Sequence, residues 1–139
     1  MTSFDRRALL AALSCAALGH PARALAATPD QRRFIDAAFA MKREAERAGD
    51  QAYGAVIVRG ETIVGWGPSR VIVNKDSSAH AEREAIRDAR KRLGNVLSGC
   101  EMYSTSRPCA ACEAAAADAD IARMFFGADA SDAGRPRRG

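Results

Sequence analysis

Two short segments, far apart in the chain, carry side chains that typically bind a metal ion. The first reads His80-Ala81-Glu82, and the second reads Pro108-Cys109-Ala110-Ala111-Cys112. Because residues three positions apart share one face of a helix, both sulfurs of the second segment can reach a single ion. Any fold of this chain must therefore bring His80 beside Cys109 and Cys112. This requirement constrains the fold more than any other feature of the sequence.

Local signals place both segments at the beginnings of helices. Ser78 is a favoured N-cap ahead of His80, and either Ser106 or Arg107 fills that position ahead of Pro108, which suits a first helical turn. Helix N-termini favour anions and lower thiol pKa values, so two thiolates there are natural ligands for zinc. Three protein ligands leave the fourth tetrahedral position open, as in catalytic zinc sites.

Glu82 follows His80 too closely to bind the same ion from the same turn. Its free carboxylate is predicted to face the open position. A carboxylate placed there can take a proton from water and pass it on during a reaction. Glu82 is therefore the candidate catalytic residue.

Two other uses of the cysteines remain open. Cys100 as a fourth ligand would close the site and make the zinc structural. Alternatively, Cys109 and Cys112 would form a redox pair, which leaves the His-x-Glu segment unexplained. Cys100 lies in a strand-like run and is more simply explained as a buried apolar residue. The fourth cysteine, Cys15, lies in an apolar leader, so a disulfide framework does not fit the pattern.

Hydrophobic periodicity predicts three helices and four strands. The predicted helices cover residues 29–48, 79–93 and 108–118, and the predicted strands cover residues 53–58, 62–66, 100–104 and 121–126. This order predicts a three-layer α/β/α sandwich around a mixed sheet, formed by a domain at 28–127. Residues 128–139, rich in Ala, Asp, Gly and Arg, are expected to form a loose tail.

The first 27 residues are typical of an export signal. Arg6-Arg7 precedes an uncharged run over 8–18, and small residues at 24–27 offer a cleavage region. The paired arginines favour a twin-arginine-like signal, and the apolar run is too short to span a bilayer. The prediction is a periplasmic or exported protein without a membrane span in its mature form. If the start codon is misassigned, the segment is an ordinary first helix and the protein is cytoplasmic.

The net charge of +4 does not point to nucleic acid. Most of the excess lies in the leader and in residues 128–139, which leaves the body of the chain close to neutral. A protein that grips phosphate backbones needs a basic footprint on its folded body. A small-molecule partner is therefore favoured over nucleic acid.

From about residue 33 to 134 the chain resembles the cytidine-deaminase-like superfamily. Residues 76–82, Asp-Ser-Ser-Ala-His-Ala-Glu, resemble its Asp-Pro-Thr-Ala-His-Ala-Glu motif, and residues 53–58 resemble its first strand. Residues 84–87 and 102–105 also follow its pattern. A His-x-Glu segment paired with Pro-Cys-x-x-Cys is the signature of zinc deaminases. Because the first ligand is His rather than Cys, the chain is most similar to the guanine deaminase and tRNA adenosine deaminase branch.

The resemblance implies a hydrolase that uses Zn²⁺ to deaminate a nucleobase or nucleoside, with a guanine-type purine favoured. A tRNA adenosine editor is the first alternative, and an inactive zinc-binding interaction module is the second. A homodimer is expected. By position, the zinc ligands are His80, Cys109 and Cys112, the proton carrier is Glu82, and the substrate contacts are Tyr53, Ala81, Ser69 and Asp132.

The chain departs from the family pattern at three positions and at its end. Ser69 stands where this branch usually has an asparagine that hydrogen-bonds the base. Arg107 replaces the usual Glu before Pro108, and Ala111 replaces a common Met. Relatives continue further after the fourth predicted strand, so the fold is expected to be shortened at the C-terminus. The serine bears on how the base is held.

Overall fold

A computed structural model describes residues 25–139, and the predicted export signal at 1–27 lies almost entirely outside this part. The described residues form three helices and five strands. The helices are α1 (Pro29–Arg47), α2 (Ala81–Leu93) and α3 (Ala110–Asp118). The strands are β1 (Gly54–Arg59), β2 (Thr62–Pro68), β3 (Cys100–Ser104), β4 (Arg123–Phe126) and β5 (Ser131–Gly134). Within the described range, no helix is long and apolar enough to cross a membrane.

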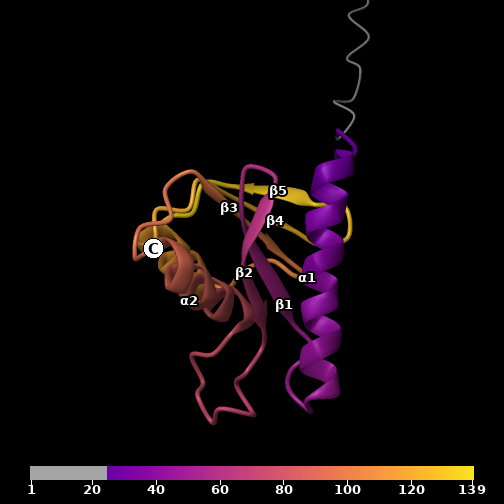
Figure 1. The fold of residues 1–139 in the computed structure, drawn as a ribbon, viewed down its shortest axis with the longest axis vertical. Helices are drawn as coiled ribbons and strands as arrows, with labels where there is room; N and C mark the ends of the chain where they lie inside the picture. The colour runs from indigo at the N-terminus through magenta and orange to yellow at the C-terminus, as the bar shows by residue number, and fades with distance from the viewer. Residues whose placement is uncertain (1–24) are drawn as a thin grey trace, which may run out of the picture.

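The strands form one mixed sheet in the order β2-β1-β3-β4-β5. Only β3 and β4 run parallel, because α3 connects them as a crossover, and all other neighbours are antiparallel. Helix α1 covers one face of the sheet, and α2 and α3 cover the other (Figure 1). The predicted three-layer α/β/α sandwich is confirmed.

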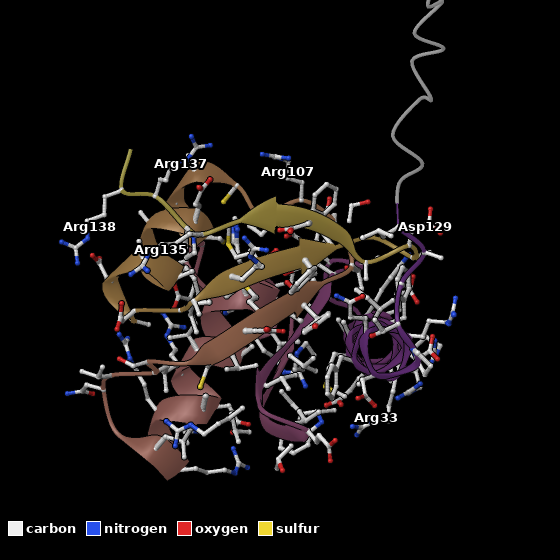
Figure 2. All side chains as sticks on the ribbon, turned by 90° about the horizontal axis from the view of Figure 1, so that it is seen from above. Arg33, Arg107, Asp129, Arg135, Arg137 and Arg138 are labelled. Atoms are coloured by element: carbon white, nitrogen blue, oxygen red, sulfur yellow. The ribbon has the colours of Figure 1, made fainter. Side chains whose placement is uncertain are left out.

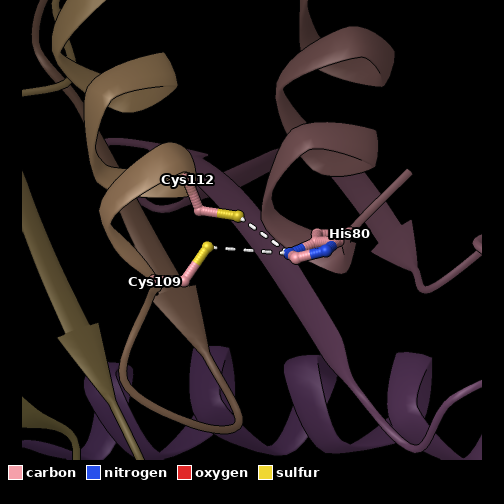
Figure 3. Close-up of side chains that lie close together, drawn as sticks. All are labelled: His80, Cys109 and Cys112. Atoms are coloured by element: carbon pink, nitrogen blue, oxygen red, sulfur yellow. Dashed lines mark hydrogen bonds between the residues drawn. The ribbon is translucent and has the colours of Figure 1, made fainter. Parts of the chain in front are cut away.

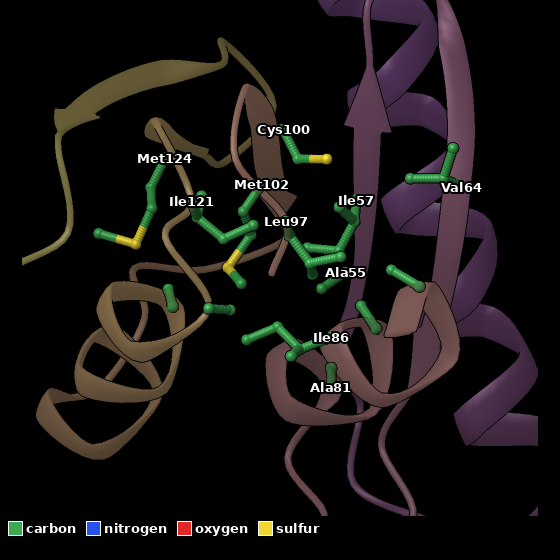
Figure 4. Close-up of a cluster of buried hydrophobic side chains, with 14 residues drawn as sticks. Ala55, Ile57, Val64, Ala81, Ile86, Leu97, Cys100, Met102, Ile121 and Met124 are labelled. Carbon is green, nitrogen blue, oxygen red and sulfur yellow. The ribbon is translucent and has the colours of Figure 1, made fainter. Parts of the chain in front are cut away.

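Each face of the sheet has its own core. Against α2 and α3 the core is aliphatic and includes Ile86, Leu97, Met102 and Ile121, each at most 2% exposed (Figure 4). Against α1 the core is aromatic. There Tyr103 lies 5.2 Å from Phe34 and 4.8 Å from Phe125, measured between ring centroids. The two cores together fix both helix layers against the sheet, and so fix the helix ends that carry the site.

Two glycines allow the helices to lie unusually close to the strands. A Cβ added at Gly67 would lie 2.0 Å from the carbonyl oxygen of Ala81, the first residue of α2. One added at Gly54 would lie 2.1 Å from the carbonyl oxygen of Ala38 in α1. Only glycine permits this approach of helix backbone to strand backbone. Gly67 therefore helps to place the beginning of α2, where His80 lies.

The expectation of a loose tail after residue 127 was wrong. Residues 131–134 form β5, which pairs antiparallel with β4 at the edge of the sheet. The chain then continues along α3 through three ion pairs, which join Arg135 to Asp120, Arg137 to Glu113 and Arg138 to Asp118. An edge strand is stabilised by backbone hydrogen bonds, so β5 needs little of the hydrophobic pattern by which strands are predicted.

Candidate metal and catalytic site

His80 and Cys109 are the N-cap residues of α2 and α3. This differs slightly from the predicted helix starts, which placed a cap upstream of each residue. Ser78 does not cap α2, because its backbone N–H and hydroxyl both donate to Asp76 Oδ1, at 2.8 and 2.7 Å. Neither helix has a side-chain cap bond, so free backbone N–H groups and positive dipole ends remain at the site. Both features favour anionic ligands there.

The structure brings His80, Cys109 and Cys112 together (Figure 3). The Nδ1 atom of His80 lies 3.7 Å from Cys109 Sγ and 3.4 Å from Cys112 Sγ. Zn–S and Zn–N bonds of ordinary length in a tetrahedral site separate the two ligand atoms by about 3.6 Å. The three side chains therefore fit a zinc ion without rearrangement.

Cys100 does not join this group. It is fully buried in the aliphatic core, and the ligand group found among residues 25–139 contains only His80, Cys109 and Cys112. The structural four-ligand alternative therefore lacks its fourth ligand. Three protein ligands leave a coordination position for water or substrate, as in catalytic zinc sites.

Glu82 lies beside the ligands and is only 7% exposed. Burial raises the pKa of its carboxyl, although contacts with Cys112 and His80 partly oppose this rise. Burial also raises the pKa of the Cys112 thiol, and the charge of Glu82 raises it further. A buried thiol beside a buried carboxyl needs a cation if it is to ionise, and Cys112 is in this position. The site is thus chemically consistent with a divalent metal and a carboxyl poised to exchange protons.

A cavity of about 370 Å³ opens onto this group. This volume is within the range of small-molecule sites. Five of the predicted site residues line the cavity: Tyr53, His80, Ala81, Glu82 and Cys109. Three further residues line the cavity and were not predicted to do so from the sequence: Gln51, Ser106 and Arg107. Their proximity to Tyr53 and Cys109 in the sequence was the available signal.

Ser69, a predicted substrate contact, does not line this cavity. Its side chain is fully buried, and its hydroxyl donates to Asp50 Oδ1 at 2.9 Å. The loop after β2 is held by the same carboxylate, since the backbone N–H groups of Ile72 and Val73 donate to Asp50 Oδ2. Serine at this position therefore belongs to a buried hydrogen-bond network around Asp50.

Asp132, the other predicted contact, lies on β5 and is also absent from the cavity lining. Its Oδ2 accepts a hydrogen bond from Arg123 at 3.0 Å, and its Oδ1 accepts one from the Gly134 N–H at 2.7 Å. These bonds stabilise the edge strand. The structure does not bring Asp132 together with the zinc ligands.

Ser104 at the end of β3 has the one fully buried side-chain oxygen without a hydrogen-bond partner among residues 25–139. Its hydroxyl lies near Glu82 and opposes the rise in the Glu82 pKa. Buried hydroxyls are normally hydrogen-bonded, and exceptions concentrate at functional sites. This hydroxyl is available to interact with the Glu82 carboxylate as the latter gains and loses its proton.

With this geometry in place, the chain can be compared with known proteins. Residues 28–128 match the cytidine and deoxycytidylate deaminase zinc-binding region. A tRNA-specific adenosine deaminase of Buchnera aphidicola subsp. Baizongia pistaciae is 38% identical over 96 residues, which cover 68% of this chain and 59% of that protein. A guanine deaminase of Bacillus subtilis is 36% identical over 102 residues, which cover 72% of this chain and 65% of that protein. The chain therefore spans less than two thirds of the length of these relatives.

Solved structures show the same fold. A structure of guanine deaminase from Bacillus subtilis has a TM-score of 0.66 and 36% identity, over 69% of this chain and 62% of that one. A structure from a study of A-to-I editing by tRNA:A34 deaminases has a TM-score of 0.66 and 33% identity, over 68% of this chain and 70% of that one.

Proposed function

Because the chain belongs to the cytidine and deoxycytidylate deaminase zinc-binding family, we propose that it catalyses the hydrolytic deamination of a nucleobase or nucleoside. Water replaces the exocyclic amino group, and ammonia leaves. One observation supports this most strongly: three ligand atoms lie within 4.8 Å of one another, and two of the ligand residues, His80 and Cys109, line a cavity together with the buried Glu82. A purely structural zinc site would need neither the cavity nor the carboxyl.

Metal binding and proton transfer would be carried out by different residues. His80, Cys109 and Cys112 would hold the ion, which when bound lowers the pKa of water to near neutrality. Glu82 would accept a proton from the attacking water and donate it to a ring nitrogen of the base. Glu82 would then carry the second proton to the departing amino group. Burial raises the pKa of this carboxyl, which favours the protonated form that the donation step needs.

A guanine-type purine is the favoured substrate. The relative named guanine deaminase supports a guanine-type purine. The small net charge of the folded body favours a small molecule over nucleic acid. The second candidate is adenosine in tRNA, because several tRNA-specific adenosine deaminases are between 33 and 40% identical to this chain. Both candidates use the same zinc ligands and the same proton carrier.

Ammonia release from zinc-loaded protein tests the proposal. Guanine, guanosine, adenosine, cytosine, cytidine and a tRNA anticodon stem-loop would be compared. Release from one or more of them is expected, with guanine first among the free bases. The Glu82→Gln variant should keep its zinc and lose activity by a factor on the order of hundreds or more. Absence of release from every substrate would contradict the proposal, and equal rates for the variant would remove Glu82 from the mechanism.

A further inference from the structure

Ser104 ends strand β3 with a side chain that is fully buried. Successive side chains of a strand alternate between its two faces, so Ser104 shares a face with Cys100 and Met102. Both of these residues belong to the aliphatic core beneath α2 and α3, and so does Ala55, which pairs with Ser104 across to β1. Ser104 therefore points toward the helix layer that carries Glu82 and the zinc ligands.

The chain after Ser104 leads from the core to the surface around the cavity. Ser106 and Arg107 line the cavity, and Arg107 is exposed and extends outward from the protein (Figure 2). Glu82 lines the same cavity from the first turn of α2. Ser104 is not among the residues that line this cavity, so its hydroxyl approaches Glu82 from the interior of the protein.

The Ser104 hydroxyl is buried and yet unpaired. Within residues 25–139 it is the one fully buried side-chain nitrogen or oxygen without a hydrogen-bond partner. A buried hydroxyl without a partner destabilises the folded chain, and alanine would avoid this penalty. The Glu82 carboxyl is a neighbour that can become its partner, since the hydroxyl opposes the rise in the Glu82 pKa that burial causes.

Bound zinc would leave Glu82 with few other hydrogen-bond donors. Its neighbours include His80, Cys112 and its own backbone N–H. A cysteine binds zinc as a thiolate, which has no proton to donate, and a histidine nitrogen that binds the ion is equally occupied. The Ser104 hydroxyl both donates and accepts, so it can bond to the carboxyl in either protonation state.

We propose that Ser104 is a positioning residue, whose hydroxyl hydrogen-bonds the Glu82 carboxyl and holds it toward the reacting water and base. This inference rests on the proposed deaminase function and adds a residue that touches neither substrate nor metal. A glutamate side chain rotates about several bonds, and a hydrogen bond from the rigid sheet restricts that rotation. Misplacement of a catalytic group by about 1 Å can lower a rate about 100-fold.

Turnover by zinc-loaded protein tests the role of Ser104 in catalysis. Ser104→Ala should keep its zinc and lower kcat about tenfold with KM little changed, because the aligned carboxyl is needed in the transition state. Ser104→Thr and Ser104→Val introduce side chains of the same shape that differ in the hydroxyl. The variant that keeps the hydroxyl should have the higher kcat by a similar factor. In a Glu82→Gln background, Ser104→Ala should have little further effect, because the two residues act as a unit.

Carbon-13 NMR tests the contact independently of turnover. In protein labelled at the carboxyl carbons of glutamate, the Glu82 resonance is the one that Glu82→Gln removes. Ser104→Ala should shift this resonance, because the carboxyl loses a hydrogen-bond partner. Ser98→Ala is the matched control, since the Ser98 hydroxyl also donates to a carboxylate, that of Asp120, at an exposed site. The control should leave both the Glu82 resonance and kcat unchanged.

The outcomes separate this proposal from the deaminase function. An unshifted Glu82 resonance or a native kcat in Ser104→Ala would overturn the role of Ser104, and so would equal rates for Ser104→Thr and Ser104→Val. Deamination that persists unchanged in Ser104→Ala would leave the deaminase function intact. A shifted resonance in a protein that deaminates no substrate would support the contact and refute the deaminase function.

Discussion

At the scale of single residues, Asp50 is the centre of a hydrogen-bond network that includes a residue of the cavity lining. This carboxylate is 9% exposed and accepts hydrogen bonds from the Ser69 hydroxyl and from the backbone N–H groups of Gln51, Ile72 and Val73. Gln51 lines the cavity, and the loop containing Ile72 and Val73 leads toward His80. Asp50 thus connects the cavity wall to the segment that delivers a zinc ligand.

Stability in acid should depend on Asp50. Burial alone would raise its pKa, but the four hydrogen bonds outweigh burial and hold the pKa below its ordinary value. The folded state therefore binds this proton less readily than the unfolded state, and the stabilisation is lost as pH falls below about 4. In urea unfolding of metal-free protein between about pH 3 and 6, the free energy of unfolding should fall more steeply for the native chain than for Asp50→Asn. Parallel pH profiles would contradict this role.

Ser69→Asn, which introduces the residue usual in related chains, should not create a base contact here. The serine side chain is fully buried and directed at Asp50, so the larger amide must displace its neighbours. Overpacking of this kind costs roughly 1–3 kcal/mol. Urea unfolding should show that loss, while Ser69→Ala, which removes only the hydroxyl, should lose less. A gain in guanine turnover at unchanged stability would show that position 69 does reach the base.

The zinc ligands were predicted correctly from sequence, and Tyr53 and Ala81 do line the cavity, but Ser69 and Asp132 do not. His80, Cys109 and Cys112 carry chemistry in a fixed spacing, and the structure confirms that they come together. Ser69 and Asp132 were inferred from position alone, and the direction of a side chain depends on its partners in the fold. Asp50 and Arg123 are those partners, and neither lies near its partner in the sequence.

At the scale of elements, the site depends on the N-termini of α2 and α3, which lie close together. Each helix begins at a zinc ligand instead of at an ordinary side-chain cap. The thiolates of Cys109 and Cys112 would offer anionic partners to these helix ends in place of a cap. The starts of α2 and α3 were therefore predicted two residues early, because Ser78 and Ser106 look like caps in sequence. Strand β5 was missed because an edge strand needs backbone bonds more than apolar side chains.

Gly67→Ala should push α2 away from β2 and disturb the site. The added Cβ would lie 2.0 Å from the Ala81 carbonyl oxygen and 2.4 Å from the Ala85 N–H nitrogen, both backbone atoms. We expect a loss of stability of several kcal/mol, at the upper end of overpacking effects, and weaker zinc binding in competition with a chelator. Gly60→Asn is the control, since its turn has φ of +60° and open space. Wild-type stability and zinc affinity in Gly67→Ala would show that the close approach is unnecessary.

At the scale of the whole molecule, the three-layer sandwich explains why residues distant in sequence form one site. The order of helices and strands, together with two ligand-bearing helix starts, was enough to predict this architecture. Two features were not predictable, because both depend on exposed polar groups. They are the pairing of β5 with β4 and the ion pairs that hold the last residues along α3. The export signal and the homodimer stay predictions.

The central claim is that His80, Cys109 and Cys112 alone hold one catalytic zinc ion. Zinc content per chain, measured by elemental analysis on purified protein after dialysis, tests it most directly. We expect about one zinc per native chain, because three ligands and one open position complete a tetrahedral site. Cys112→Ser should lose the ion, whereas Cys100→Ser, which alters a buried core residue, should retain it whenever it folds. Full zinc content in Cys112→Ser would contradict the account.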